Sequence, residues 1–416
     1  MKLILPILCL ALAAQAQTNR WWKGNTHTHT FWSDGDDFPE MVAGWYKEHG
    51  YHFLAISDHN VMLEGEKWLS ITNAARRKTL EKYSERFGAD WIEERTLDNT
   101  QRVRLKTLIE FRKLLEESNR FLMIPSEEIT AMLTIHINAT NPREFIKPRL
   151  GSNALEVMQL NVDAVLDQRE RTGQPMFPHI NHPNFGLAIT AEDLMRVKGD
   201  KFFEVYNGHA QVHSFGYKGH PGMDTVWDIV LAHRLTDLNL GVMYGVGVDD
   251  SHHYHAMTVS NSNPGRGWVV VRAPELTAAA IIKAMEAGDF YASSGVRLKD
   301  VQFRTNTLVI EIEPEDGVSY TTQFIGTRKN FDRSSSPGVS LVGKPVTRQY
   351  SADVGEVFAV RRGKRAEYTM SGEELYVRAK VVSSKLKENP HAPGEKETAW
   401  TQPVLPTPTL PPPHPP

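Results

Sequence analysis

The sequence has almost no cysteine, no strong excess of charge of either sign and no long apolar run. Its single cysteine, Cys9, lies in a short N-terminal apolar segment, so a mature chain without that segment has no disulfide and no thiolate metal site. The formal net charge of −3 gives no electrostatic basis for binding nucleic acid or an anionic membrane. The apolar segment, residues 3–13, is too short to span a bilayer. These absences argue against a disulfide-rich scaffold, a nucleic-acid-binding protein and a membrane-spanning chain.

The first residues have the pattern of a secretory signal peptide. Lys2 provides the positive charge, residues 3–13 the apolar core, and Ala14-Gln15-Ala16 a small-x-small cleavage site. We therefore expect residues 1–16 to be a signal peptide and the mature chain to begin near Gln17. The protein is then expected to be periplasmic or secreted, with no membrane attachment after cleavage.

Histidine is what the sequence has in quantity: there are seventeen, and they gather near the ends of predicted strands. In His27-Thr28-His29 the two imidazoles are two residues apart, so they face the same side of an extended segment. Neutral imidazoles side by side suit Zn²⁺, Mn²⁺ or Fe²⁺, and Asp34 just beyond adds a carboxylate. An isolated His-x-His is more often a solvated turn, but here the same kind of strand end recurs along the chain.

Apolar strands alternate with amphipathic helices between residues 22 and 295. Predicted strands that lead into ligand-type residues are 53–57 before Asp58-His59, 121–125 before Glu128, 133–135 before His136, 175–180 before His182, 202–206 before His209 and 241–248 before Asp250 and His252. This alternation indicates parallel strands buried on both faces. If the strands curl into a barrel, their C-terminal ends meet on the face where such barrels hold their active sites. The ligand-type residues would then converge, although they are far apart in the sequence.

Three other regions differ in composition and in hydrophobic pattern. Residues 64–119 are charged with helical apolar spacing, which predicts a helical insertion that forms either a lid or a packed wall. Residues 296–405 contain short alternating runs split by Gly, Asp, Asn and Ser, which predicts a small antiparallel, β-sandwich-like domain. Residues 406–416 are Pro-rich and are expected to be disordered. We therefore expect two folded units that meet near Gly295.

The motifs between Trp22 and Gly295 resemble those of the PHP (polymerase and histidinol phosphatase) family of metal-dependent hydrolases. The matching segments are His27-Thr28-His29 with Ser33-Asp34-Gly35, Ser57-Asp58-His59, Glu128 with His136, Asn181-His182-Pro183, and Asp250-Ser251-His252. The exported CehA/McbA-type branch is the narrower resemblance, through Gly24-Asn25-Thr26-His27, residues 290–295 and Ala399-Trp400-Thr401-Gln402-Pro403. The resemblance implies an α/β fold, a distorted TIM-like (β/α)7 barrel, that carries a di- or trinuclear metal centre. Since the family's Pro-Gly-x-Glu is Pro125-Ser126-Glu127-Glu128 here, the choice between the two glutamates stays open.

Imidazoles and carboxylates make up the predicted metal site, which suits Zn, Mn or Fe. The expected ligands are His27, His29, Asp34, His59, Glu128, His136, His182, Asp250 and His252. Asp58 is expected to orient His59, because a metal-bound histidine usually donates its other N–H to such a group. His179 and His209 are expected either to donate protons beside the site or to be packed histidines. Glu204, in an apolar strand, needs a partner.

These residues predict a hydrolase that uses a metal-bridged hydroxide. A phosphate ester is the first expectation for the small-molecule substrate, and the CehA/McbA-type resemblance implies amide, ester or carbamate hydrolysis as the alternative. A rival from another class is a non-catalytic exported protein that binds a polymer through its β domain. The rival is disfavoured because every motif position is filled with a ligand-type residue. The sequence does not fix the oligomeric state.

Overall fold

The structure, a computed structural model, describes residues 19–132 and 134–407. Within these residues the protein is a mixed α/β structure with one large mixed sheet and three smaller antiparallel sheets. The predicted signal peptide and residues 408–416 of the Pro-rich tail lie outside the described residues. None of the helices in the described part is long and apolar enough to cross a membrane.

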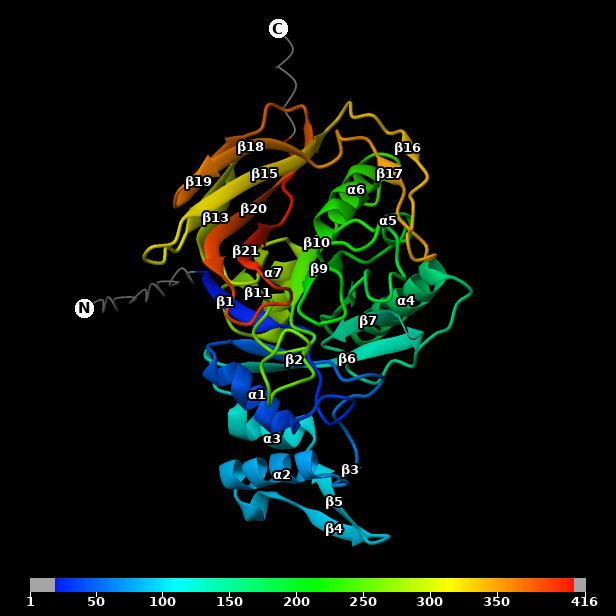
Figure 1. Cartoon of the computed structure of the whole chain (residues 1–416), viewed down its shortest axis with the longest axis vertical. Coiled ribbons are helices and arrows are strands. Elements are labelled where there is room, and N and C mark those ends of the chain that lie inside the picture. The colour runs from blue at the N-terminus through cyan, green and yellow to red at the C-terminus, as the bar shows by residue number, and fades with distance from the viewer. Residues whose placement is uncertain (1–18, 133, 408–416) are drawn as a thin grey trace, which may run out of the picture.

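Seven strands of the large sheet carry the region in which we predicted alternating strands and helices (Figure 1). They are β1 (Arg20–Asn25), β2 (Phe53–Ile56), β6 (Leu122–Met132), β7 (Ile135–Thr140), β8 (Phe177–Ile180), β9 (Phe202–Asn207) and β10 (Tyr244–Val248). The pairs β1–β2, β2–β6, β8–β9 and β9–β10 are parallel, and β7 is antiparallel to both β6 and β8. All of these strands except β7 therefore point the same way, so their C-terminal ends lie at one edge.

Backbone hydrogen bonds just beyond the strands join the two ends of this run, β10-β9-β8-β7-β6-β2-β1. The amide of Asp250, after β10, donates to the carbonyl of His27, after β1, at 3.0 Å, and His29 donates to Ser251 at 3.0 Å. At the same edge of the sheet, the amide of Ser57, after β2, donates to the carbonyl of Thr28, after β1. The chain segments that carry the predicted ligands are thus held to one another by backbone bonds.

The expectation of a wholly parallel arrangement, with residues 133–135 as a strand leading into His136, is wrong. β6 continues past Glu128 to Met132, and β7 begins at Ile135 in the opposite direction, so His136 lies near the start of a returning strand. The reason is geometric, because a connection this short can join only antiparallel strands.

Helices between the strands begin and end where the sequence indicates. They are α1 (Pro39–Glu48), α4 (Ala154–Thr172), α5 (Ala191–Leu194), α6 (Met223–Leu235) and α7 (Ala278–Glu286). Pro39 occupies the first turn of α1. Asn153 caps α4 by accepting the amide of Glu156, and Gly173 ends the same helix with φ 68°. Apolar faces of these helices pack on the sheet, as Trp227 of α6 does in the core.

The insertion between β2 and β6 is mixed α/β, so the prediction of an all-helical segment over residues 64–119 is wrong. It contains β3 (Lys67–Ser70), α2 (Ala74–Phe87), the short 3₁₀ helix η1 (Ala89–Trp91), β4 (Glu94–Leu97), β5 (Thr100–Leu105) and α3 (Leu108–Leu115). The strands form their own antiparallel sheet, β3-β5-β4. Its tight hairpin uses Asp98 and Asn99, both at positive φ (50° and 55°), which Asp and Asn tolerate and a two-residue hairpin requires. This turn was not predicted, because the charged composition of the segment favoured a helical interpretation.

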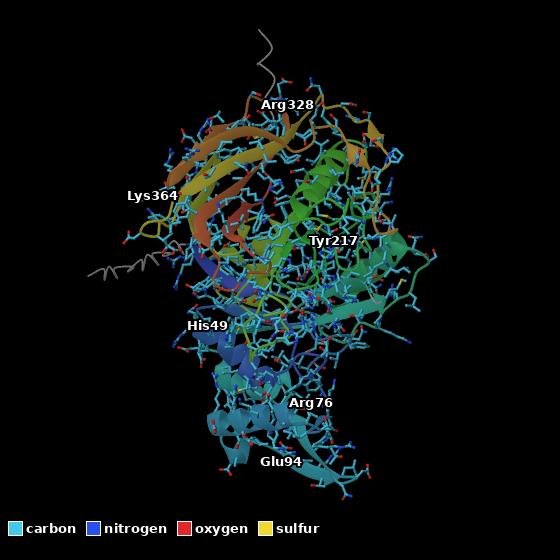
Figure 2. All side chains as sticks on the ribbon, in the orientation of Figure 1. His49, Arg76, Glu94, Tyr217, Arg328 and Lys364 are labelled. Carbon is cyan, nitrogen blue, oxygen red and sulfur yellow. The ribbon has the colours of Figure 1, made fainter. Side chains whose placement is uncertain are left out.

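The C-terminal part extends the large sheet through β11 (Trp268–Ala273), β12 (Phe290–Ser293), β21 (Lys396–Thr401), β20 (Glu374–Leu386), β15 (Tyr320–Arg328) and β18 (Glu356–Arg362). A second sheet, β13 (Leu298–Arg304), β14 (Thr307–Ile312) and β19 (Arg365–Thr369), shares a core with it, and β16 (Ser335–Ser336) pairs with β17 (Gln349–Tyr350). Strands β15 and β18 lie at the end of the molecule opposite the insertion, as Arg328 and Glu94 show in Figure 2. The last strand of the chain returns to pair with β12, so the sheet is continuous across Gly295.

Gln402, just beyond β21, seals the free edge of β10. Its side-chain Oε1 accepts the amide of Gly245 at 2.9 Å, and its Nε2 donates to the carbonyl of the same residue at 2.9 Å. The side-chain amide thus makes the two hydrogen bonds that a neighbouring strand would make. The C-terminal region is therefore part of the wall around the predicted barrel.

A buried ion pair ties the C-terminal sheet to α6. Arg378 of β20 is fully buried, and its Nε and Nη2 donate to the two carboxylate oxygens of Asp228 at 2.8 and 2.6 Å. Tyr376 donates to the same carboxylate at 2.8 Å. Such a bidentate pair stabilises the interface only while both partners are present.

We expect Arg378→Met to lower the free energy of unfolding by about 3 kcal/mol, because it leaves the Asp228 carboxylate buried without its cation. Thermal and urea unfolding measure the effect. The control is Arg362→Met, on the exposed edge strand β18, which should change stability by less than about 0.5 kcal/mol. Equal stability of the two variants would contradict this view of the interface.

Candidate metal centre

The nine predicted ligands come from six places in the chain and meet at the C-terminal edge of the parallel strands. The residues that follow β1, β2, β8 and β10 supply most of them, while Glu128 lies within β6 and His136 within β7. Each of the nine belongs to at least one of five overlapping groups whose ligand atoms lie within 4.8 Å of one another. The structure therefore brings together every side chain that was predicted to bind metal.

His27 is fully buried and held by a carboxylate behind it. Its Nδ1 lies 2.6 Å from Oε1 of Glu204, which comes from β9. Its Nε2 points the other way, 3.1 Å from Nε2 of His29 and 3.2 Å from Oδ1 of Asp250. This is the arrangement in which a carboxylate orients a histidine ligand and leaves the second ring nitrogen for a metal.

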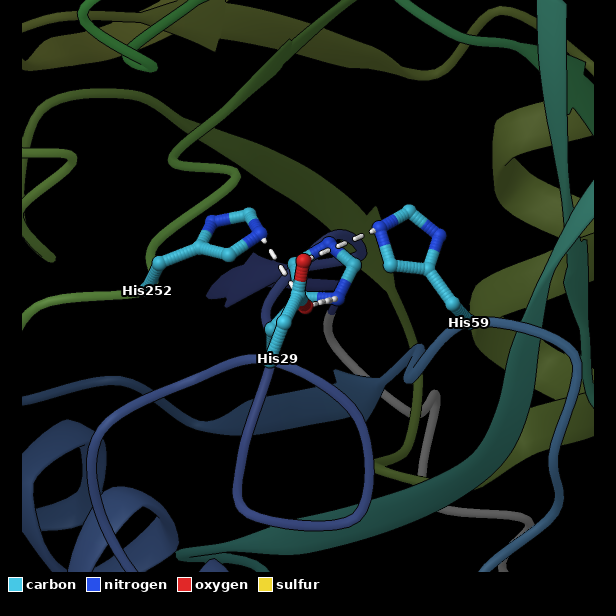
Figure 3. Close-up of side chains that lie close together, drawn as sticks. His29, His59 and His252 are labelled. Carbon is cyan, nitrogen blue, oxygen red and sulfur yellow. Dashed lines mark ion pairs between the residues drawn. The ribbon is translucent and has the colours of Figure 1, made fainter. Parts of the chain in front are cut away.

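A second group of side chains lies around Asp34 at the more open side of the cluster. Figure 3 shows the imidazoles of His29, His59 and His252 turned toward one another, with dashed lines for the ion pairs that their ring nitrogens make with a carboxylate between them. Asp34 is 3.6 Å from His29, 3.6 Å from His59 and 3.4 Å from His252, measured from carboxylate oxygen to ring nitrogen. The rings of His29 and His252 stack with centroids 4.1 Å apart.

Glu128 occupies the middle of the cluster. Its Oε2 is 2.8 Å from Nδ1 of His59, and its Oε1 is 2.9 Å from Nδ1 of His136. Asn181 donates to the same Oε1 at 2.7 Å. A carboxylate between several imidazoles is positioned to bridge two cations.

Glu127 points away from the cluster, because successive residues of a strand face opposite sides. Its Oε1 accepts the amide of Ile146 at 2.7 Å, and burial raises the pKa of its carboxyl to about 8. Of the two glutamates that the sequence left open, Glu128 is the one placed to bind metal.

Asp250 faces the cluster, and its neighbour Asp249 faces the opposite way. Asn207 of β9 donates to Oδ2 of Asp250 at 3.0 Å. Asp249 instead accepts Tyr46 and the backbone amides of Gly265, Arg266 and Gly267, so it pins the loop that follows. Asp250 and His182 both have positive φ, 49° and 25°. Such backbone conformations cost energy and persist where the surrounding structure holds them in place.

Charges in the cluster stabilise one another. Burial lowers the pKa of His27, but Asp250, Glu204 and Glu128 more than offset this and hold it well above the usual value. Burial raises the pKa of Glu128, yet His59, His27 and His136 keep it well below the usual value. Burial and the neighbouring His252 lower the pKa of His29 to about 3. The carboxylates thus create a site that favours bound positive charge.

The donor set fits a multinuclear site for borderline divalent cations. The groups share His27, His29, His59 and Glu128, so adjacent positions have ligands in common. The Nε2 of His136 is buried and has no hydrogen-bond partner among the described residues, as expected of an atom that is meant to coordinate. Nitrogen and carboxylate donors without thiolate suit Zn, Mn or Fe and do not select among them.

The residues predicted to assist catalysis have mixed outcomes. Asp58 does not orient His59: it accepts the Thr30 amide, the Thr30 hydroxyl and the Ser33 hydroxyl, so it shapes the loop that presents Asp34. The groups near Nδ1 of His59 are the Thr130 hydroxyl, at 2.6 Å, and Oε2 of Glu128, at 2.8 Å. His179 is fully buried 3.3 Å from Glu204, and with Glu204 and His27 it forms one of the five ligand groups. His209 has its ring 5.2 Å from that of His252, outside every ligand group.

A cavity of about 340 Å³ opens onto the cluster. Besides predicted ligands it is lined by Phe185, His209, Gln211 and His253. Its lining contains neither lysine nor arginine. Sequence reasoning missed the roles of Thr130, Asn181 and Asn207, because an ordinary polar residue carries no local signal that it will touch a ligand. Glu204 did carry one, as a glutamate in an apolar strand.

Comparisons with known proteins found no family match and a distant structural similarity. No protein-family model matches the sequence, and no curated protein matches it. Among solved structures, the chain is similar to a two-domain protein containing a predicted PHP-like metal-dependent phosphoesterase from Bacteroides vulgatus ATCC 8482. The match covers 92% of this chain and 95% of that chain at 16% identity, with a TM-score of 0.37. The proposals below rest on the residues and geometry of this chain.

Metal binding should release protons at neutral pH. In the metal-free protein the pKa of His27 is well above its usual value. Burial lowers the pKa of His59, but the carboxylates of Glu128 and Asp34 more than offset this and raise it to about 9. Both imidazoles are therefore protonated at pH 7 and must lose a proton to coordinate, so affinity should rise with pH and fall as pH drops. Calorimetric titration of Zn²⁺ in buffers of different ionisation enthalpy should show at least one proton released per chain. A heat that does not depend on the buffer would contradict this.

Proposed function

We propose that this protein is a metal-dependent hydrolase of the PHP type that acts on phosphate esters. The observation that carries the proposal is the completeness of the cluster: all nine predicted ligands lie in overlapping, mutually close groups. A protein that had lost activity would be expected to have lost some of these residues. The run of strands β10-β9-β8-β7-β6-β2-β1, with hydrogen bonds from Asp250 to His27 and from His29 to Ser251 between its two ends, supports a distorted (β/α)7 barrel as the scaffold.

Side chains of this chain have separate tasks in such a reaction. Bound divalent cations supply a water of lowered pKa and positive charge for the developing negative charge of the transition state. Glu204 fixes the ring of His27, and Asn181 fixes the carboxylate of Glu128, so both enter the reaction already oriented. His209 and His253 line the cavity without belonging to a ligand group, which leaves them able to contact a substrate.

Amide, ester or carbamate hydrolysis of the CehA/McbA type is the second candidate. The observation that favours it is the cavity wall, which has no lysine or arginine to meet a charged phosphate. A neutral scissile group would need only the metal cluster and the polar groups of His209, Gln211 and His253. A purely polymer-binding protein is disfavoured, because it would have no use for a complete ligand set.

The test is a hydrolysis screen on protein reconstituted with Zn²⁺, Mn²⁺ or Fe²⁺. Substrates are p-nitrophenyl phosphate, bis(p-nitrophenyl) phosphate, p-nitrophenyl acetate and 1-naphthyl methylcarbamate, each with a chelator-treated control. Phosphate release that depends on metal supports the first proposal, and turnover of the acetate or carbamate alone supports the second. If no substrate is hydrolysed in a metal-dependent manner, the hydrolase proposal fails for these classes.

We further propose that the protein is exported, on the basis of the signal-like pattern in residues 1–16. N-terminal sequencing of natively produced protein should find the chain starting near Gln17. Recovery of an intact Met1 from the cytoplasm would refute export.

A further inference from the structure

A second cavity, of about 460 Å³, lies where β1, α1 and β11 meet the loop between β20 and β21. Its walls include Lys23 of β1, Trp45 of α1, Tyr51, Trp268 of β11, and Lys385 and Glu397 from the C-terminal part. It shares no residue with the cavity over the metal cluster. We call it the junction cleft.

Lys23 places a cation in the junction cleft without an anion to balance it. Its Nζ lies 3.8 Å from the ring centroid of Tyr51 and 4.1 Å from that of Trp268. Across residues 19–132 and 134–407 it has no carboxylate within ion-pair distance and no hydrogen-bond acceptor for this ammonium group. Burial lowers the pKa of Lys23 to about 8, against the smaller opposing effect of Asp249. A partly buried ammonium that contacts only ring faces gains strongly from an added anion.

The other two lysines of the junction cleft are already paired. Lys385 lies 2.8 Å from Glu315 and 3.1 Å from Glu397. Lys387 lies 3.1 Å from Glu395 and donates to the Tyr206 hydroxyl at 2.7 Å. Lys23 is therefore the lysine of this lining that is free to bind a ligand's negative charge.

Aromatic side chains form the rest of the wall beside Lys23. The ring centroid of Tyr51 is 6.4 Å from that of Trp45 and 6.2 Å from that of Trp268. His49 stacks on Trp45 at 3.8 Å, at the surface position marked in Figure 2. The Tyr51 hydroxyl is buried with no hydrogen-bond partner in the described part of the chain. Ring faces next to an unpaired cation suit a flat or cyclic ligand that carries an anionic group.

A singly charged anion fits the junction cleft better than a phosphate. Lys23 offers one charge and no forked guanidinium contributes to the lining. The helix end that reaches the cleft, at Trp45 and His49, is the C-terminal end of α1, whose partial negative charge opposes a dianion. Glu388, exposed at the rim, also disfavours a ligand with two negative charges.

We propose that the junction cleft is a second binding site, for a carboxylate carried on a six-membered ring. The carboxylate pairs with Lys23, and the ring packs against Trp45 and Trp268. An aromatic acid and a uronic acid share this chemistry, and the experiment separates them. The site is distinct from the hydrolytic centre and does not depend on the reaction assigned to it.

Isothermal titration of the metal-loaded full chain with benzoate and with glucuronate tests the proposal. At least one should bind, and the tighter of the two identifies the ring type. Lys23→Gln should weaken that binding at least 10-fold. Lys299→Gln, an exposed lysine elsewhere, and His252→Ala, in the metal cluster, should leave it within 2-fold, which separates the junction cleft from carboxylate binding at the metals.

Three results would overturn the proposal: no binding of either acid, equal binding by Lys23→Gln, or loss of binding in His252→Ala alone. If Lys23→Gln does not fold, Lys23→Met keeps the apolar stem over the rings and removes the charge. A crystal structure of the wild-type protein with benzoate locates the ligand without any variant. Inorganic phosphate that binds as tightly as the acids and loses that binding in Lys23→Gln would contradict the preference for a single negative charge.

Discussion

Glu128→Gln should abolish metal-dependent hydrolysis while leaving the protein folded. The carboxylate lies at the centre of the cluster, where it contacts both His59 and His136. Glutamine keeps the size and the hydrogen-bond acceptor but removes the charge, so at least one cation loses its bridging ligand. We expect the rate constant kcat to fall about 1,000-fold or more, as when a strong electrostatic contribution to the transition state is lost. Steady-state kinetics and metal analysis of the purified variant measure the effect.

Glu127→Gln is the matched control, since it makes the same chemical change one residue earlier on the same strand. Glu127 faces away from the cluster and accepts the amide of Ile146, a hydrogen bond that glutamine can also accept. Metal content and kcat should stay within about 2-fold of the wild type. If the two variants had equal effects, or if the roles were reversed, the assignment of the bridging carboxylate would be wrong.

His252→Ala should remove metal from the open side of the cluster and reduce turnover about 100-fold or more. His252 stacks on His29 and faces Asp34, so its loss leaves that group with fewer nitrogen donors. The thermal midpoint of the metal-free protein should move only a few degrees, because the ring contributes little to the apolar core. Metal analysis, steady-state kinetics and thermal unfolding of the His252→Ala variant measure these three effects.

His253→Ala is the control for His252→Ala. His253 lines the same cavity but belongs to no ligand group, and its Nδ1 accepts the amide of Ser262. This variant should keep the full metal content even if it changes the Michaelis constant. Loss of metal from His253→Ala, with full retention in His252→Ala, would show that the cluster is built differently.

The sequence predicts the location of the site well because the signal is local. Four strands, β1, β2, β8 and β10, are followed within a few residues by ligand-type side chains, as His59 follows β2 and Asp250 follows β10. Parallel strands bring their C-terminal ends to one edge, so a local pattern is enough to predict convergence. The structure does place all nine candidates together, and whether they bind metal remains a prediction.

Contacts between distant parts of the chain could not be predicted in the same way. Glu204 orients His27 across 177 positions of sequence, and Gln402 completes the edge of β10 across 157. A glutamate such as Glu204 or a glutamine such as Gln402 does not indicate, by its residue type, which distant residue it will contact. The Asp98-Asn99 hairpin in the insertion was missed because its first strand, β4, is exposed throughout and lacks the apolar alternation on which strand prediction depends. Asp58 precedes His59 in the sequence, so we predicted that it orients the His59 ring. In the structure its side chain instead accepts a hydrogen bond from the backbone of the neighbouring loop.

Metal content and activity of the same preparation, measured before and after chelation, test the central claim most directly. Plasma mass spectrometry of purified protein should find at least two equivalents per chain of Zn, Mn or Fe. Removing them should abolish hydrolysis of whichever substrate the screen identifies, and adding the metal back should restore it. A preparation that holds less than one equivalent and hydrolyses that substrate equally fast after chelation would contradict the account.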